Sequence, residues 1–161
     1  MLPRSSERLF RRATLVAAAL AGALGLSGCF GVRYDPTMAS KPYPAHLHTT
    51  KVIDVQVFHE GETILLVNAT LNDFESFKLW LNQRFRMDVE SLPAGGRVRL
   101  PLNRFWDEWG GGPNPGGIFR RYEPTPIRLA EIEGSDEQPM VGLICIPTET
   151  EIANLSRRED E

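Results

Sequence analysis

The sequence predicts an all-β domain, an antiparallel β-sandwich of about seven short strands with one short helix. Three observations lead to this fold class. Segments of alternating apolar and polar residues recur about every 8–12 residues, turn residues separate them, and no long helical pattern follows any of them. Because parallel sheets are built from alternating strands and helices, this pattern does not favour a parallel sheet.

The first expected strand has the clearest alternation. Ile53, Val55 and Val57 lie on one side of an extended chain, and polar Asp54 and Gln56 lie between them on the other side. A turn that contains a glycine then leads to a second strand, which predicts a hairpin. The expected strands are residues 50–58, 63–70, 77–82, 83–89, 97–102, 118–122, 126–134 and 138–147.

The third expected strand places a tryptophan on its outer side. Phe77, Leu79 and Leu81 share one face, so Trp80 points the other way. An outward tryptophan is a candidate for ligand contact. The competing interpretation is that the stems of neighbouring basic side chains cover it.

One short helix and one glycine-rich loop are expected after the fifth strand. Residues 103–109 predict one or two helical turns, because Asn103 can cap the amino end and two acidic residues follow. Residues 110–117 consist of glycine, proline and asparagine, which predicts a flexible loop. Residues 148–161 are charged and poor in apolar groups, so we expect a frayed helix or disorder there.

The amino-terminal residues 1–28 have the layout of a secretory signal peptide. Four arginines precede an uncharged apolar run, and the run ends in small residues. This run is shorter than the 20 or so apolar residues that a membrane-spanning helix needs. We therefore expect a cleaved signal rather than a retained span.

The end of that run, Leu26-Ser27-Gly28-Cys29, resembles the lipobox of bacterial lipoproteins. The resemblance covers residues 1–29. It implies that Cys29 receives a diacylglycerol and becomes the first residue of the mature chain, whose new amino terminus is then acylated with a fatty acid such as palmitate. Two or more acyl chains hold a protein stably on a bilayer. Phe30 replaces the aspartate that retains well-studied Gram-negative lipoproteins on the inner membrane, which favours the outer membrane. The competing interpretation is an ordinary secreted protein.

Composition limits the classes of partner. Removing residues 1–28 takes four arginines from 18 basic residues and one glutamate from 21 acidic residues, which leaves a net charge of about −6. A nucleic-acid partner would need clustered lysine and arginine, so we expect none. We expect instead a membrane contact through the lipid and an unidentified envelope protein or polysaccharide as partner.

The mature chain divides into three parts. Residues 29–49 are rich in proline and predict an extended tether, with the alternative that this segment lies along the domain as an extra edge. Residues 50–147 hold the β-sandwich, and residues 148–161 the charged tail. The sandwich resembles immunoglobulin- and fibronectin-type modules of bacterial envelope proteins, a resemblance carried by Val67-Asn68-Ala69-Thr70, Leu79-Trp80-Leu81-Asn82, Pro93-Ala94-Gly95-Gly96 and Leu102-Asn103-Arg104-Phe105. Such a resemblance implies a fold rather than a function.

The cluster around Trp106, Asp107 and Trp109 is the strongest candidate for a binding site. Tryptophans beside carboxylates can stack on sugars or on aromatic peptide groups. The competing interpretation is that a tryptophan closes an open end of the sandwich. We expect Trp109 to be more exposed than Trp106, because it lies where the short helix meets the glycines.

Other candidate chemistry is weaker. His46 and His48 share a strand face, but zinc needs three or four ligands, so we expect no metal site. Cys145 lies in an apolar run, so we expect it to be a buried core residue. The sequence contains no motif for a nucleophile, a phosphate or a dinucleotide, so we expect no cofactor and no catalytic residues. The favoured function is a non-enzymatic envelope module, and the alternative is a small envelope enzyme whose site lies at Trp106–Trp109 and the glycine loop.

Overall fold

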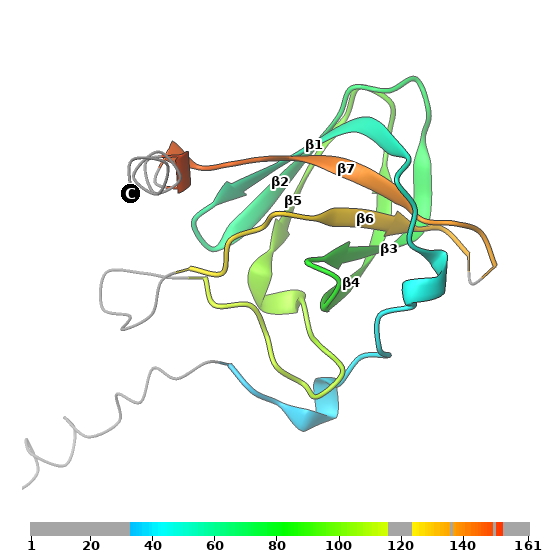
Figure 1. Ribbon diagram of the computed structural model, residues 1–161. Helices are drawn as coiled ribbons and strands as arrows, with labels where there is room; N and C mark the ends of the chain where they lie inside the picture. The colour runs from blue at the N-terminus through cyan, green and yellow to red at the C-terminus, as the bar shows by residue number, and fades with distance from the viewer. Residues whose placement is uncertain (1–32, 116–123, 136, 150, 153–161) are drawn as a thin grey trace, which may run out of the picture. The chain divides into compact units, whose positions relative to one another are not determined.

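The strands pair into one mixed sheet in the computed structural model (Figure 1). The structure describes residues 33–115, 124–135, 137–149 and 151–152, all within the second of two compact units, Val32–Glu161. In this part of the chain the strands are β1 Val52–Glu60, β2 Thr63–Asn68, β3 Phe74–Leu81, β4 Phe85–Leu92, β5 Arg97–Pro101, β6 Ala130–Glu133 and β7 Val141–Ile146. Short 3-10 turns are η1 Pro36–Met38, η2 Ala45–Leu47 and η3 Leu102–Arg104.

The strand order is β4-β3-β6-β7-β1-β2-β5. All neighbouring strands are antiparallel except β1 and β7, which are parallel. The all-β prediction is therefore confirmed. The antiparallel sandwich and its immunoglobulin- or fibronectin-like arrangement are not confirmed, because the described strands form a single sheet with one parallel pair. That pair needs no helical crossover, since most of the domain lies between its two strands in the sequence.

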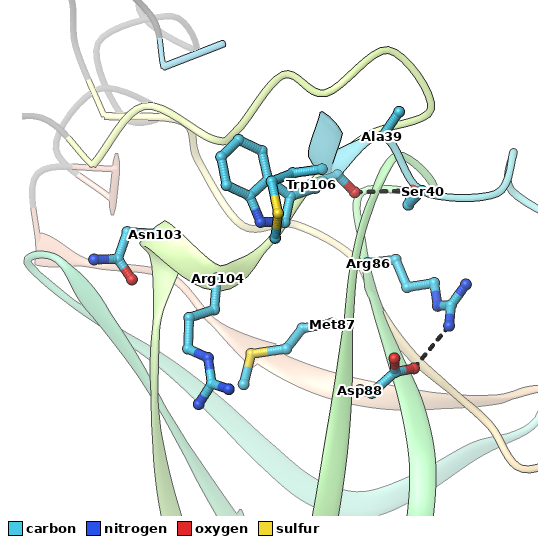
Figure 2. A pocket seen from close by; sticks show the side chains of 9 residues that line it. Ala39, Ser40, Arg86, Met87, Asp88, Asn103, Arg104 and Trp106 are labelled. Carbon is cyan, nitrogen blue, oxygen red and sulfur yellow. Dashed lines mark hydrogen bonds and ion pairs between the residues drawn. The ribbon is translucent and has the colours of Figure 1, made fainter. Parts of the chain in front are cut away.

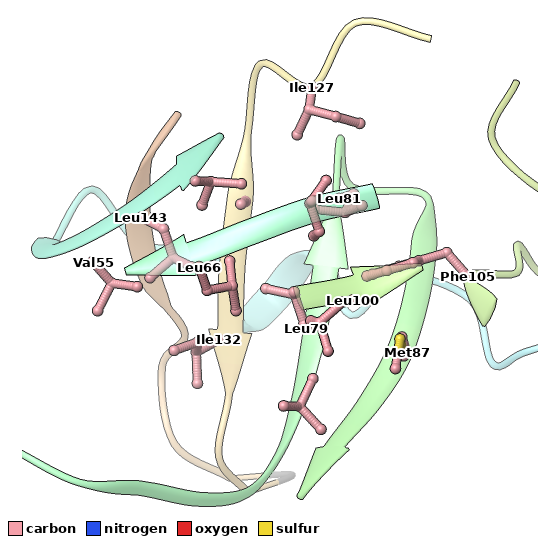
Figure 3. Packing of buried hydrophobic residues seen from close by; sticks show 14 of the residues in the cluster. Val55, Leu66, Leu79, Leu81, Met87, Leu100, Phe105, Ile127, Ile132 and Leu143 are labelled. Atoms are coloured by element: carbon pink, nitrogen blue, oxygen red, sulfur yellow. The ribbon is translucent and has the colours of Figure 1, made fainter. Parts of the chain in front are cut away.

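The sheet is strongly curved, because strands from its two edges share one core. Met87 on edge strand β4 and Leu100 on edge strand β5 belong to the same buried cluster as Leu79 in β3. Figure 3 shows these side chains and Phe105 directed into a common interior. The predicted inner face of the first strand is also confirmed, since Val55 is fully buried there.

The predicted helix at residues 103–109 is wrong. Only η3 forms, and its amino end is Pro101, which makes no side-chain cap. Phe105 is already extended, with φ −91° and ψ 137°. Its side chain is fully buried in the core, and this burial outweighs a weak local helical preference.

Several predicted elements have different lengths in the structure. The fourth strand begins at Phe85 because Asn82 and Gln83 take the left-handed conformation and make a tight turn. Strands β6 and β7 are shorter than the predicted 126–134 and 138–147. The tail begins with a helical turn in which the Ile152 amide donates to Thr148 O at 2.9 Å. The signal peptide, Cys29, the predicted strand at 118–122 and the rest of the tail lie outside the described residues.

The proline-rich residues 33–48 pack against the sheet. Leu47 is buried against Trp80 and Met140 on the outer face of the sheet, and Leu47 O accepts a hydrogen bond from the Met140 amide at 2.8 Å. The described part of the predicted tether therefore lies along the domain, as one of the two interpretations expected. Within the described residues, no helix combines the length and the apolar content needed to cross a membrane.

Candidate binding surface at the tryptophan loop

Residues 105–112, which we call the tryptophan loop, are held to the edge of the sheet. Trp106 forms a bridge with Arg86 in β4, with N–O distances of 2.9 and 3.1 Å. The chain then reverses, and the Asp107 amide donates to Gly111 O at 2.8 Å. Gly110 has φ +85°, and a Cβ there would collide with the backbone of Asp35. The loop therefore requires glycine at this position.

Asp107 holds the reversal together. Its Oδ1 accepts hydrogen bonds from the amides of Gly111 and Trp109, at 2.6 and 3.0 Å. Its Oδ2 accepts two from the Arg84 guanidinium, at 2.7 and 3.0 Å. Burial opposes ionisation, but the hydrogen bonds from Arg84, Gly111 and Trp109 outweigh it, and the pKa of Asp107 is lowered. The predicted candidate for ligand contact is thus a buried structural carboxylate.

Residues 33–40, which we call the N-terminal segment, run beside the tryptophan loop. The Asp35 amide donates to Gly110 O at 2.7 Å, and the Gly112 amide donates to Arg33 O at 3.0 Å. The Arg33 guanidinium carbon also lies 3.5 Å from the centroid of the Trp106 ring. This cation–π contact occupies one side of the indole.

A surface hollow of about 430 Å³ lies beside Trp106 (Figure 2). The N-terminal segment, β4 and η3 contribute to its wall. Two guanidinium groups border it, those of Arg86 and Arg104, and Arg86 also pairs with Asp88 at 2.8 Å. The lining residues are Met38, Ala39, Ser40, Arg86, Met87, Asp88, Asn103, Arg104 and Trp106. An indole and arginine side chains around one hollow can contact a sugar ring or an acidic group.

The structure separates the tryptophans that the sequence grouped together. Trp109 does not line this hollow. It lies at a smaller one of about 200 Å³ with Arg84 and Asp107. Trp109 is 62% exposed and Trp106 is half-buried, which confirms the predicted order of exposure. Trp80 faces outward from the main core as predicted but is almost fully buried, so it is no longer a candidate for ligand contact.

Trp80 belongs to a polar network that sequence reasoning missed. Its Nε1 donates to Glu133 Oε2 at 2.6 Å, and Lys78 Nζ lies 2.5 Å from Glu133 Oε1. Next to it, Glu131 accepts a hydrogen bond from the Tyr43 hydroxyl at 2.8 Å. Both glutamates are buried beneath residues 41–48. Alternation along β6 places them on the outer face, where sequence reasoning expects solvent, and the covering segment is not encoded in that local pattern.

The same segment supplies the aromatic and histidine partners of this network. Burial is the main cause that raises the pKa of Tyr43. The hydrogen bond to Glu131 and the charge of Glu131 raise it further. The Tyr43 and Trp80 rings meet edge to face, with centroids 5.4 Å apart. His48 Nδ1 lies 2.7 Å from Glu131 Oε1. The network therefore fastens the segment to the sheet.

His46 and Cys145 are the remaining residues that the sequence offered as candidates. His46 is exposed, and no three histidine, cysteine or acidic side chains among the described residues are placed to hold a metal ion. Cys145 is partly buried rather than fully buried, and it packs against the main core. The pKa of its thiol is raised to about 11, mainly by burial and secondly by the charge of Glu151.

The chain was compared with protein families, curated proteins and solved structures, and no match was found.

Proposed function

We propose that this chain is a lipid-anchored, non-enzymatic protein of the bacterial cell envelope. The observation that carries the proposal is the sequence Leu26-Ser27-Gly28-Cys29 at the end of an arginine-led apolar run. A thiol at this position suits lipid attachment, and the mature chain then begins four residues before the packed N-terminal segment. The absence of aspartate after Cys29 supports the outer membrane as the site of the anchor.

The roles of the reactive groups support a binding or structural module over an enzyme. Asp107, Glu131 and Glu133 are buried, and all three are engaged in hydrogen bonds that join segments of the fold. The raised pKa keeps the Cys145 thiol protonated near neutral pH, and a protonated thiol is a poor nucleophile. At the tryptophan loop, Asp107 is engaged with Arg84, and its neighbour Glu108 lines the smaller hollow with Trp109 rather than the hollow beside Trp106.

The hollow beside Trp106 is the proposed contact with an envelope partner. Trp106, Arg86 and Arg104 offer an aromatic edge and two guanidinium groups. This chemistry fits a polysaccharide with acidic groups or an acidic segment of an envelope protein. The net charge of the mature chain, about −6, makes nucleic acid an unsuitable partner.

The anchor is tested with Cys29→Ser, and Cys145→Ser is the matched control. Both variants remove one thiol, but only Cys29→Ser removes the proposed lipid attachment point. We expect wild type and Cys145→Ser to fractionate with membranes and to carry a lipidated Cys29 by mass spectrometry. Cys29→Ser should be soluble or unprocessed. An unmodified mature terminus at another residue would show that the anchor proposal is wrong.

A further inference from the structure

The chain leaves little distance between the proposed anchor and the packed domain. Cys29 precedes Arg33 by four residues, and a fully extended chain spans at most about 3.3–3.6 Å per residue. The reach from Cys29 to Arg33 is therefore no more than about 14 Å. From Arg33 onwards, hydrogen bonds hold the chain to the tryptophan loop. A lipid on Cys29 would therefore keep this part of the domain close to the bilayer surface.

The same part of the domain exposes three large apolar side chains. Tyr34 is 66% exposed, Met38 46% and Trp109 62%. Tyr34 and Met38 belong to the N-terminal segment, and Trp109 belongs to the tryptophan loop. Tyr34 forms a bridge with Gly111, so the two segments lie side by side, and Figure 1 places η1 and this loop at the same end of the unit. We call these three side chains the apolar patch.

The charges around the patch do not favour an electrostatic contact. The two segments carry one arginine, Arg33, and three acids, Asp35, Asp107 and Glu108. Anionic lipid attracts clusters of lysine and arginine, which the two segments lack. Three arginines line the neighbouring hollows, and two of them, Arg84 and Arg86, are paired with Asp107 and Asp88. Tryptophan and tyrosine are enriched at the boundary between headgroups and acyl chains, where one end of the side chain is apolar and the other is hydrated.

We propose that Tyr34, Met38 and Trp109 insert into the headgroup boundary of the bilayer that holds the lipid on Cys29. The inference rests on the proposed anchor. The lipid already holds the protein at the bilayer, so the patch meets the membrane at a high effective concentration. A small apolar contact is then enough to orient the domain. The occupant of the patch is a zwitterionic phospholipid surface.

The test is tryptophan quenching in the full lipidated protein. The protein is reconstituted into phosphatidylcholine vesicles with or without bromine on the acyl chains, because brominated chains quench tryptophans that reach them. We expect brominated lipid to lower the emission of wild type. Trp109→Phe should lose most of this decrease, because Trp80 is buried and Trp106 is covered on one side by Arg33.

A matched control places a tryptophan at the other end of the β3–β4 hairpin. Leu71 is 97% exposed and lies in the loop before β3. This loop adjoins the Leu92 end of β4, and the tryptophan loop adjoins the Phe85 end. The eight residues of β4 separate these ends by about 23 Å at roughly 3.3 Å per residue. In the Trp109→Phe background, Leu71→Trp should show no additional quenching.

The outcomes separate the docking inference from the anchor proposal. Mass spectrometry of the same sample reports lipidation at Cys29. A lipidated protein whose Trp109 is not quenched would overturn the docking inference and leave the anchor intact. Equal quenching of tryptophans at positions 71 and 109 would also overturn it, because the domain would then have no preferred orientation. An unlipidated terminus would remove the anchor, and the docking inference with it.

Discussion

The guanidinium carbon of Arg33 lies 3.5 Å from the centroid of the Trp106 ring. Arg33 is the first residue that the structure describes, and Trp106 lies far from it in the sequence, in the tryptophan loop. The contact therefore closes the N-terminal segment onto the tryptophan loop. It also means that Trp106 has two roles, because the same indole borders the hollow of about 430 Å³. A ligand in the hollow would contact an indole whose position Arg33 already fixes.

Trp106→Ala and Trp109→Ala should differ in their effect on stability. Loss of half-buried Trp106 should lower the free energy of unfolding by about 2–3 kcal/mol, because packing and the Arg33 contact are both lost. Exposed Trp109 should contribute within about 0.5 kcal/mol. Urea unfolding followed by circular dichroism measures both values. Equal losses would contradict the assignment of Trp109 to the surface.

Asp107→Asn should destabilise the domain by about 1–3 kcal/mol, because the Gly111 amide and the Arg84 guanidinium lose their charged acceptor. Asp88→Asn is the matched control, since Asp88 also pairs with an arginine but is 74% exposed. It should change the free energy of unfolding by no more than about 0.5 kcal/mol. A similar effect of the two substitutions would show that burial of Asp107 contributes nothing.

The loss of stability caused by Asp107→Asn should depend on pH in a defined direction. The folded state lowers the pKa of Asp107, so its stabilisation is present above the ordinary value of about 3.9. This stabilisation is lost as the pH falls through the folded pKa. The difference in the free energy of unfolding between wild type and Asp107→Asn should therefore shrink in acid. A difference that stays constant from neutral pH to about pH 2 would contradict this linkage.

Tyr43→Phe removes the hydroxyl that donates to buried Glu131 at 2.8 Å. The carboxylate then lacks one donor, and we expect a loss of about 1–3 kcal/mol in the free energy of unfolding. Tyr34→Phe is the control, because its ring is largely exposed, and it should be nearly neutral. Guanidinium unfolding of both variants gives the comparison. A neutral Tyr43→Phe would mean that His48 alone satisfies Glu131.

Cys145 should react slowly with a thiol reagent in the folded protein. Its pKa is raised from an ordinary value of 9.0 to about 11, so the thiolate fraction at neutral pH is about a hundredfold lower. Labelling of Cys29→Ser, in which Cys145 is the remaining thiol, should accelerate about tenfold for each pH unit up to that range. Denaturant should abolish the protection. Rapid labelling of the native protein at neutral pH would show that the thiol is accessible and ionised.

Local alternation predicted the strands and their inner faces because burial of one face repeats every second residue. Val55 and Leu79 are examples, since both are buried as the pattern indicates. The parallel pairing of β1 with β7 could not be predicted in this way. The two strands are distant in the sequence, and neither contains a local signal for its partner. The antiparallel sandwich is not confirmed for this reason, although the all-β prediction is.

The site was predictable to a similar extent. The position of Trp109 next to glycines indicated its exposure, which is confirmed. The burial of Asp107 and Trp80 was not predictable, because segments from elsewhere in the chain cover them. Trp80 pairs across strands with Glu131, but this pairing belongs to the fold and leaves no signal in the local pattern of either segment.

The position of β7 has a consequence for how the protein is made. This strand lies between β6 and β1, so it joins the β4-β3-β6 group to the β1-β2-β5 group. Neither group can complete the sheet before Val141–Ile146 has been synthesised. Pairing of strands distant in sequence is slow, because a long loop must close before the contact forms. The sheet therefore stays open until the last of the described strands is available. If the chain is exported as proposed, this delay would keep it in the unfolded state that passage through a translocation channel requires.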